Sequence, residues 1–220
     1  MNLFRVKQLT LVLASAVALT ASAPREGGWR VIGPGGGGAL FHPTVSPHDP
    51  GTVLVACDMT GNYITTDAGS RWRGFNLGGP VELFLFDPVD PLVIYAKAGA
   101  LFRSADGGTT WARLFPSTVA KITMGDDHAS QTLHRASGPR GDIGAMAIDP
   151  GDSRVLYLAI DATLWISGDG GATWQKAADL RGRARRIWID PRSSKTDRTL
   201  YVAGPDAMYR RQAGAWRTGT

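Results

Sequence analysis

The sequence contains a single cysteine, Cys57, and charged side chains make up only 20% of its 220 residues. A single cysteine excludes an intramolecular disulfide, so a packed core must stabilise the fold. The low charge content, together with 43% hydrophobic residues, argues against a largely disordered chain. Cys57 follows the apolar run 53–56, which predicts that its thiol is buried.

The sequence patterns of several enzyme classes are also absent. We find no Ser/His/Asp motif for nucleophilic catalysis, no phosphate-binding loop and no cysteine–histidine cluster with zinc-ligand spacing. The sequence therefore predicts neither a cofactor nor a bound metal. Nucleic acid is not expected as a partner of an exported chain with this composition.

No apolar run is long enough to cross a bilayer. The run 9–19 follows two basic residues, Arg5 and Lys7, and is followed by small residues at 21–23. This arrangement is typical of a secretory signal peptide. We therefore predict a signal peptide over residues 1–23, no membrane span after its cleavage, and a secreted or periplasmic protein.

The formal net charge is +5, and much of the positive excess lies in one short run. It contains four arginines: Arg181, Arg183, Arg185 and Arg186. Such a cluster can bind a phosphate or an acidic glycan. A run of this kind is more often a solvated loop, and we favour the loop.

A repeated turn motif dominates the rest of the sequence. The pattern Ser/Thr-x-Asp-x-Gly-x-x-Trp occurs at 65–72, 104–111 and 167–174. In each copy the Asp carboxylate can accept hydrogen bonds from backbone N–H groups, and Gly supplies a positive φ. We therefore expect three β-hairpin turns, each covered by the apolar body of its Trp.

A second landmark, a turn proline followed by an apolar run, recurs in step with the first at Pro47, Pro88, Pro150 and Pro191. The period is close to 40 residues and is broken once by an insertion, and each unit contains four short apolar strands. This is the signature of a β-propeller blade. We predict an all-β propeller with four four-stranded antiparallel blades. The expected segments are blades at about 28–77, 78–116, 141–180 and 181–220, with an insertion loop at 117–140.

Residues 28–32 are similar to an outermost strand, although the fourth unit already has its own. This surplus strand predicts an incomplete or N-terminal part of a larger propeller, with missing blades or an oligomer covering its exposed sheet edges.

The insertion contains candidate ligands for a divalent metal: Asp126, Asp127, His128 and His134. These residues lack tight ligand spacing, so a loop over one propeller face is the favoured interpretation.

The three turn motifs resemble those of the Asp-box (BNR) propeller superfamily. That group includes sialidases, family 74 xyloglucanases, sortilin-type receptors and photosystem II assembly-factor-like proteins. The resemblance implies that the motif lies at the blade periphery and is structural. We accordingly expect no catalytic role for the motif residues Asp67, Trp72, Asp106, Trp111, Asp169 and Trp174.

The first blade resembles sortilin-type propellers and, in more detail, the start of family 74 glycoside hydrolases. The similar parts are the glycine run 33–38, the segment 41–44 and the segment 58–63. In the family a segment of the type Asp-x-Gly-Gly-x-Tyr carries one catalytic Asp, and here Asp58 has that position, with Thr60 in place of the first Gly. A hydrogen-bonded turn residue is the alternative interpretation of Asp58.

Glycines allow a sugar to approach the backbone closely, and aromatic rings can stack on pyranoses. The candidate ligand-binding residues are Gly36, Gly37, His42 and Tyr63.

Glycoside hydrolysis needs two carboxylates, and in the family the second comes from a second propeller. The sequence therefore favours an exported module that binds a polysaccharide, an oligosaccharide or a protein, without a complete catalytic set. The first alternative is a fragment of a family 74-like hydrolase with Asp58 as one catalytic carboxylate. The second is an assembly-factor-like scaffold.

Overall fold

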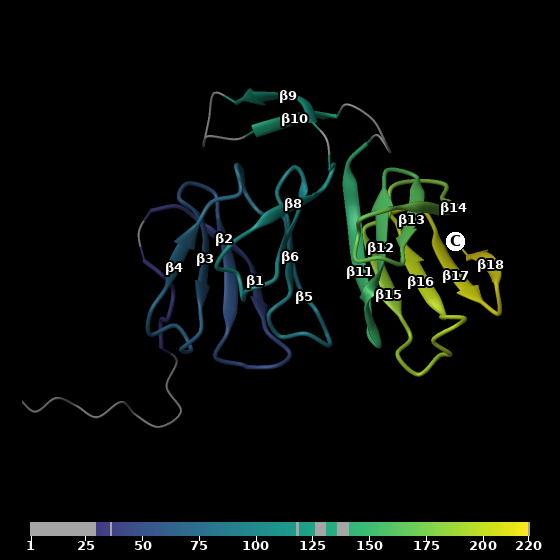
Figure 1. The fold of residues 1–220 in the computed structure, drawn as a ribbon, viewed down its shortest axis with the longest axis horizontal. Helices are drawn as coiled ribbons and strands as arrows, with labels where there is room; N and C mark the ends of the chain where they lie inside the picture. Colours follow the sequence, from purple (N-terminus) through teal and green to yellow (C-terminus); the bar gives the residue numbers. More distant parts are fainter. Residues whose placement is uncertain (1–29, 36, 118, 126–130, 136–140, 220) are drawn as a thin grey trace, which may run out of the picture. The chain divides into compact units, whose positions relative to one another are not determined.

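The computed structural model describes residues 30–35, 37–117, 119–125, 131–135 and 141–219. The chain separates into two compact units, Met1–Val31 and Ile32–Thr220, and all described strands belong to the second. This unit contains four antiparallel four-stranded sheets and one two-stranded sheet (Figure 1). The prediction of an all-β chain built from four-stranded antiparallel blades is confirmed, and the described residues form no helix.

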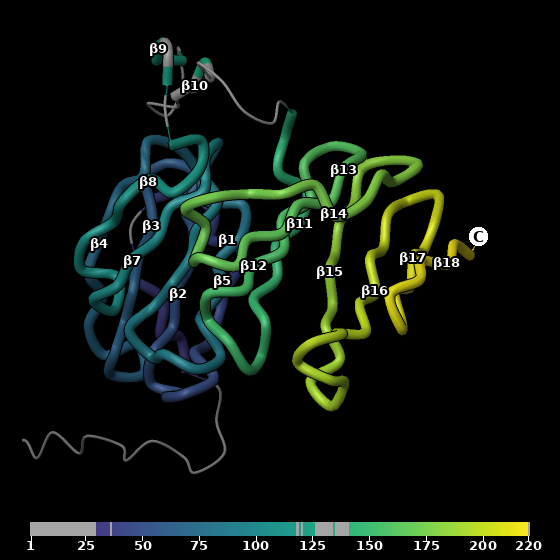
Figure 2. Tube along the Cα trace, turned by 45° about the vertical axis from the view of Figure 1, so that its right-hand side comes forward, coloured from purple at the N-terminus to yellow at the C-terminus, as the bar shows by residue number. Residues whose placement is uncertain are grey.

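In each four-stranded sheet the strands are hydrogen-bonded in chain order, as in a propeller blade. Blade 1 consists of β1 (Leu40–Val45), β2 (Val53–Cys57), β3 (Gly61–Thr65) and β4 (Arg73–Phe75). Blade 2 consists of β5 (Leu83–Phe86), β6 (Ile94–Lys97), β7 (Leu101–Ser104) and β8 (Ala112–Phe115). Blade 3 consists of β11 (Ile143–Asp149), β12 (Asp152–Ile160), β13 (Thr163–Ser167) and β14 (Gln175–Asp179). Blade 4 consists of β15 (Arg186–Ile189), β16 (Leu200–Ala203), β17 (Met208–Gln212) and β18 (Ala215–Gly219), which lie side by side in this order in Figure 2.

Aspartate turns join the first and second strands of blades 2 and 3. Asp87 Oδ1 accepts a hydrogen bond from the Val89 N–H at 2.8 Å, and Asp149 Oδ1 accepts one from the Gly151 N–H at 2.8 Å. The proline after each of these aspartates has no N–H to leave unpaired, so the chain reverses at low cost. The strands that follow, β6 and β12, then enter the core, and all four residues of β6 are buried.

The apolar cores lie between consecutive blades. Ile64 of blade 1 belongs to one cluster with Phe84 of blade 2, and Tyr95 of blade 2 belongs to another with Leu158 of blade 3. A third cluster joins blades 3 and 4. Because each blade buries its apolar side chains against the next, no blade has a complete core of its own.

The three Ser/Thr-x-Asp-x-Gly-x-x-Trp turns share one hydrogen-bond pattern. In blade 2 the Ser104 hydroxyl donates to Asp106 Oδ1 at 2.8 Å and accepts from the Gly108 N–H at 2.8 Å. The Asp106 carboxylate also accepts from the N–H and the hydroxyl of Thr110, at 2.8 and 2.6 Å. Gly107 and Gly108 have φ angles of 66° and 80°, a backbone conformation that favours glycine. Hydrogen bonds within the turn thus engage the aspartate.

These hydrogen bonds lower the pKa of the turn aspartates. The Thr110 hydroxyl and N–H, with Ser104, lower the pKa of Asp106 to about 2, and Thr173 and Ser167 do the same for Asp169. In the unfolded chain both carboxyls return to their ordinary value of 3.8. The turns therefore contribute stability that is complete above that value and is lost as the pH falls toward about 2.

We predict that the melting temperature falls steadily between about pH 4 and pH 2. The double variant Asp106→Asn/Asp169→Asn should show a flatter dependence in this window, because neither turn then carries a titrating carboxyl. Circular dichroism melts across the pH range test this, with Asp206→Asn at an exposed turn as the control. An unchanged slope in the double variant would contradict the prediction.

The motif tryptophans of blades 2 and 3 also contact the preceding blade. The expected position over the hairpin is confirmed for Trp111, whose Nε1 donates to the Gly108 carbonyl of its own turn at 3.2 Å. Trp111 stacks on Phe75 of blade 1 with ring centroids 5.1 Å apart, and Trp174 meets Phe115 of blade 2 edge-on at 6.2 Å. Gly171 lies close to Leu114 of blade 2, where an added Cβ would come within 2.6 Å of a leucine methyl carbon. The turn motif therefore also joins neighbouring blades.

Polar contacts join the blades at their aspartate turns. Ser153 of blade 3 donates a hydrogen bond to Asp87 Oδ1 of blade 2 at 2.7 Å. Arg198 of blade 4 forms a bidentate pair with Asp149 of blade 3, with N···O distances of 2.6 and 2.7 Å. Both side chains of this pair are only 4% exposed.

The structure corrects two expectations at the chain level. The insertion 117–140 was expected to be a loop, but it contains an antiparallel pair formed by β9 (Val119–Met124) and β10 (Gln131–Arg135). β-Branched residues such as Val119 and Ile122 favour this extended conformation. The strand expected at 28–32 is absent over its described part, 30–32, although the Ile32 carbonyl accepts a hydrogen bond from Trp72 Nε1 at 2.6 Å.

The fourth unit, which lacks the turn motif, closes its last hairpin with a two-residue turn. Ala213 and Gly214 have φ angles of 50° and 72° and connect β17 to β18. This is the conformation of a type I′ hairpin turn. In the part of the chain that the structure describes, no helix could span a bilayer.

Candidate functional site

Asp58 directly follows β2 and closes the end of the β1–β2 pair. Its Oδ1 atom accepts a hydrogen bond from the Ala39 N–H at 2.9 Å. Its own N–H donates to the Ala39 carbonyl at 3.4 Å. The side chain is half-buried, and Oδ2 has no hydrogen bond to any described residue. One carboxylate oxygen is thus fixed while the other is free to meet a ligand.

The glycine run packs against this aspartate. Gly38 has a φ of 96°, and a Cβ added there would lie 2.6 Å from Asp58 Oδ1 and 2.8 Å from Cys57 Sγ. Any side chain at position 38 would therefore displace the carboxylate. The Gly37 carbonyl lies 3.6 Å from Cys57 Sγ, and Cys57 is buried as predicted. Gly36 lies outside the described residues.

A chain of hydrogen bonds connects the predicted Tyr63 to the same region. The Tyr63 hydroxyl donates to Thr60 Oγ1 at 2.6 Å, and the Thr60 hydroxyl donates to Cys57 Sγ at 3.2 Å. Thr60, which was expected to replace the first Gly of an Asp-x-Gly-Gly-x-Tyr pattern, therefore holds the tyrosine ring in place. Asp58, Gly37 and Tyr63 form one group around Cys57.

His42 is not a member of this group. It lies in β1 with a φ of 52°, beside an irregularity in the β1–β2 register, and its side chain lines a different cleft. The Thr44 hydroxyl donates to the His42 carbonyl at 3.0 Å and supports this bend.

The position of Asp58 is repeated in blade 3 by Asp161. Asp161 directly follows β12, and its Oδ1 accepts a hydrogen bond from the Asp142 N–H at 3.0 Å. The Asp161 N–H donates to the Asp142 carbonyl at 3.0 Å, and Gly141 precedes the pair with a φ of 114°. The sequence separation between N–H and carboxylate is 19 residues in both blades. An aspartate directly after the second strand of a blade therefore closes the pair formed by the first and second strands.

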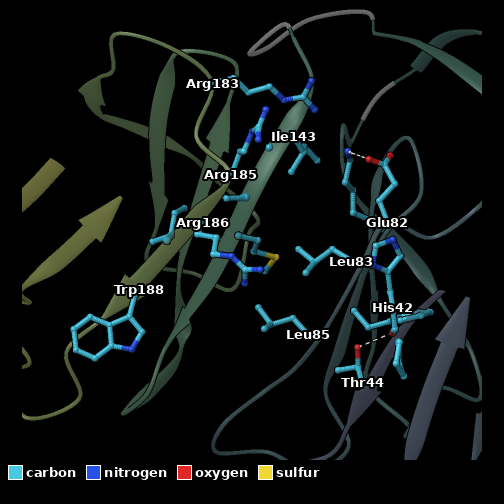
Figure 3. Close-up of a pocket in the computed structure, with 17 residues that line it drawn as sticks. His42, Thr44, Glu82, Leu83, Leu85, Ile143, Arg183, Arg185, Arg186 and Trp188 are labelled. Atoms are coloured by element: carbon cyan, nitrogen blue, oxygen red, sulfur yellow. Dashed lines mark hydrogen bonds and ion pairs between the residues drawn. The ribbon is translucent and has the colours of Figure 1, made fainter. Parts of the chain in front are cut away.

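A cleft of about 610 Å³ runs along the first strands of all four blades (Figure 3). Its lining comes from the four blades in turn: His42, Pro43 and Thr44; Glu82, Leu83, Phe84, Leu85 and Lys97; Ile143, Gly144, Ala145 and Met146; Arg183, Arg185, Arg186, Ile187 and Trp188. Figure 3 shows Leu83 and Leu85 on one side of the cleft and the arginines of blade 4 on the other. The prediction of a solvated loop is confirmed for residues 181–185, and all four clustered arginines are exposed. Arg183, Arg185 and Arg186 also line this cleft.

Three ion pairs among four side chains bound the cleft. Lys97 Nζ lies 2.6 Å from Glu82 Oε2 and 3.8 Å from Asp142 Oδ1, and the Lys97 side chain is only 5% exposed. Arg183 Nη2 lies 2.5 Å from Asp142 Oδ2. Residues that precede the first strands of blades 2, 3 and 4 therefore form a continuous charged network.

The metal-ligand candidates do not form a site in the described residues. Asp126, Asp127 and His128 lie outside them. His134 is exposed in β10, where its Nε2 atom lies 3.1 Å from the Thr123 hydroxyl. No group of three or more potential metal-ligating side chains occurs in the described part of the chain.

Comparisons with known proteins point to one family. The xyloglucanase Xgh74A of Acetivibrio thermocellus is 30% identical to this chain over 225 residues, which cover 86% of this chain and 24% of that protein. A xyloglucanase of Hypocrea jecorina is 26% identical over 214 residues, which cover 85% of this chain and 23% of that protein. This chain is homologous to a segment of the GH74 xyloglucanases. No protein-family model matches the sequence.

The solved structure of an ancestral GH74 enzyme has the same fold. It superposes with a TM-score of 0.62 at 19% identity and covers 86% of this chain and 25% of that chain. The chain thus spans about a quarter of the length of the GH74 proteins that it matches. The broader resemblances to Asp-box propellers in general and to sortilin-type receptors stay predictions.

Sequence reasoning missed several residues of both sites. Gly38 is one of four consecutive glycines, and nothing in the sequence shows which one meets Asp58. Lys97 and Glu82 are isolated charges in different parts of the chain, so only the fold brings them to the arginines of blade 4. The equivalence of Asp161 and Asp58 could have been found in the sequence by aligning blades 1 and 3 on their first strands. Each aspartate then follows its partner, Asp142 or Ala39, by 19 residues.

Proposed function

We propose that this chain is part of an exported xyloglucan-degrading glycoside hydrolase in which Asp58 is one of two catalytic carboxylates. The observation that carries the proposal is the similarity to xyloglucanases, which spans most of the chain. Export rests on the signal peptide predicted for residues 1–23.

The geometry around Asp58 supports this role. The Ala39 N–H fixes Oδ1, while Oδ2 has no hydrogen bond to a described residue. Gly38 packs against Oδ1, Gly37 borders open space, and the half-buried Tyr63 offers a ring face held by Thr60. A carboxylate with one fixed and one free oxygen, next to small residues and an aromatic ring, suits a group that acts on a glycosidic bond.

The second carboxylate must come from elsewhere. Among the residues described, no other carboxylate contacts Asp58 through a hydrogen bond. The relatives are about four times as long as the matched segment, which leaves ample chain to supply this group. We propose that it lies in a part of the complete protein outside blades 1 to 4.

A noncatalytic module that binds a polysaccharide or an oligosaccharide is the second candidate. The observation that favours it is Asp161, which makes the same hydrogen bond in blade 3 as Asp58 makes in blade 1 and so supports a strand-closing role for Asp58. The scaffold alternative and a protein partner gain no support from the comparisons.

The test is an assay on xyloglucan with residues 24–220 and with the complete gene product that contains them. We expect both to bind a xyloglucan oligosaccharide with a Kd between about 1 μM and 1 mM, the range of ordinary enzyme–substrate affinities. Titration calorimetry measures binding, and reducing-end release from the polymer measures hydrolysis. We expect hydrolysis by the complete protein. Binding without hydrolysis by that protein would support the noncatalytic module.

A further inference from the structure

The cleft along the first strands contains two positive charges with no counter-ion among the described residues. Of its four cationic side chains, Lys97 pairs with Glu82 and Arg183 pairs with Asp142. The side chains of Arg185 and Arg186 form neither an ion pair nor a hydrogen bond with any residue that the structure describes. Both residues are exposed. The cleft therefore has an excess of positive charge that no carboxylate of the described residues neutralises.

The backbone fixes the position of these two arginines. The Arg185 N–H donates to the Ala203 carbonyl at 2.8 Å, and Arg186 begins β15 opposite Ala203. Figure 3 shows Arg186 extending toward Leu83, while Arg185 extends toward Arg183. Their guanidinium groups thus project from a regular sheet, which restricts where a ligand can meet them.

The opposite wall of the cleft presents two leucines among polar residues. Leu83 and Leu85 of β5 face the arginines across the cleft, and His42, Thr44 and Glu82 lie on the same side as these leucines. A volume of about 610 Å³ lies within the range of small-molecule sites. A ligand that fits must combine an anionic group with an apolar face of some size.

We propose that this cleft binds a uronate residue of an acidic saccharide, with the carboxylate held by the guanidinium group of Arg186 and attracted by the positive charge of Arg185. Planar guanidinium groups match the two oxygens of a carboxylate and bind them through charge-assisted hydrogen bonds. The C–H face of the pyranose ring then contacts Leu83 and Leu85. A bare inorganic anion would leave these leucines without a contact. The inference is independent of the role of Asp58, because the two sites have no described residue in common.

The experiment compares trigalacturonate with its fully methyl-esterified form by titration calorimetry on residues 24–220. The two ligands share the same sugar chain and differ in the carboxylate charge and in the ester methyl groups, so no variant is needed for this first measurement. We expect the acidic trimer to bind at least about tenfold more tightly than the ester, and its affinity to fall as sodium chloride is added. Equal affinity for the two ligands, or no binding of the acidic trimer, would overturn the proposal.

Variants then locate the site. Arg185→Gln/Arg186→Gln should weaken binding of the acidic trimer by roughly tenfold or more, through loss of the charged hydrogen bonds. The control Arg192→Gln/Arg217→Gln removes the same charge from exposed positions outside the cleft and should change affinity by less than about twofold. Equal losses in the two double variants would indicate nonspecific attraction to the basic surface and overturn the proposal.

Two further arms complete the test. Arg185→Lys/Arg186→Lys keeps the charge but removes the planar fork, so affinity should lie between those of the wild-type chain and the glutamine variant. If the glutamine variant does not fold, the lysine variant replaces it in the binding measurement, and a loss of affinity is still expected. Inorganic phosphate and acetate should bind much more weakly than the acidic trimer. Comparable affinity for these small anions would show a bare anion site and contradict the assignment to a saccharide.

Discussion

Replacing Arg198 by methionine is expected to lower the free energy of unfolding by about 3–5 kcal/mol, because it leaves the buried Asp149 carboxylate without its partner. Both side chains are 4% exposed, and their two hydrogen bonds join blade 3 to blade 4. The guanidinium also donates to the Ser193 carbonyl at 2.6 Å. Urea unfolding of residues 24–220, followed by circular dichroism, measures the loss.

Two variants show whether the loss arises from an unpaired charge. Asp149→Leu/Arg198→Met removes both ions and should recover much of the stability, since apolar groups can replace a buried pair at little net cost. Arg192→Met, whose side chain is 89% exposed, should change the free energy of unfolding by less than about 0.5 kcal/mol. A loss below about 1 kcal/mol for Arg198→Met would show that water reaches Asp149 and solvates it.

The same pair has a defined pH dependence. Burial alone would raise the pKa of Asp149, but hydrogen bonds from Arg198 and the Gly151 N–H, together with the charge of Arg198, lower it overall. The pair therefore contributes its full stability above the ordinary aspartate value of 3.8 and loses it as the pH falls below that value. The stability difference between wild type and Arg198→Met should shrink in the same direction.

The Asp58→Asn variant is expected to reduce xyloglucan hydrolysis by the complete protein at least about 100-fold. Asparagine keeps an oxygen that can accept the Ala39 N–H, so the end of the β1–β2 pair stays closed while the charge and the proton-transfer capacity are lost. The melting temperature should therefore change little. Initial rates of reducing-end release, measured together with melting curves, separate the two effects.

Asp161→Asn is the matched control. Asp161 has the same hydrogen bond and the same place after the second strand of its blade, but no catalytic role is proposed for it. We expect its hydrolysis rate to stay within about twofold of the wild-type rate and its melting temperature to resemble that of Asp58→Asn. Equal, small effects on hydrolysis in both variants would assign Asp58 to strand closure alone.

The fold was largely predictable because its determinants are local and recur. Each Ser/Thr-x-Asp-x-Gly-x-x-Trp segment specifies its turn through hydrogen bonds within eight residues, as Ser104, Asp106 and Thr110 show. The insertion was harder to predict because its polar residues mask the strand preference of Val119 and Ile122. The stacking of Trp111 on Phe75 was not predicted, since this contact joins two blades and depends on how the blades pack.

The sequence by itself determined the repeat, the turn chemistry, the strand order within each blade and the position of Asp58 after a buried strand. These features depend on residues that are close along the chain, so spacing and residue type are sufficient to define them. The tertiary structure alone decided that Gly38 meets Asp58, that Asp149 pairs with Arg198, and that Arg185 and Arg186 face Leu83 across a cleft. Such contacts join positions from about 20 to about 100 residues apart in the chain, so residues that are close in sequence do not specify them.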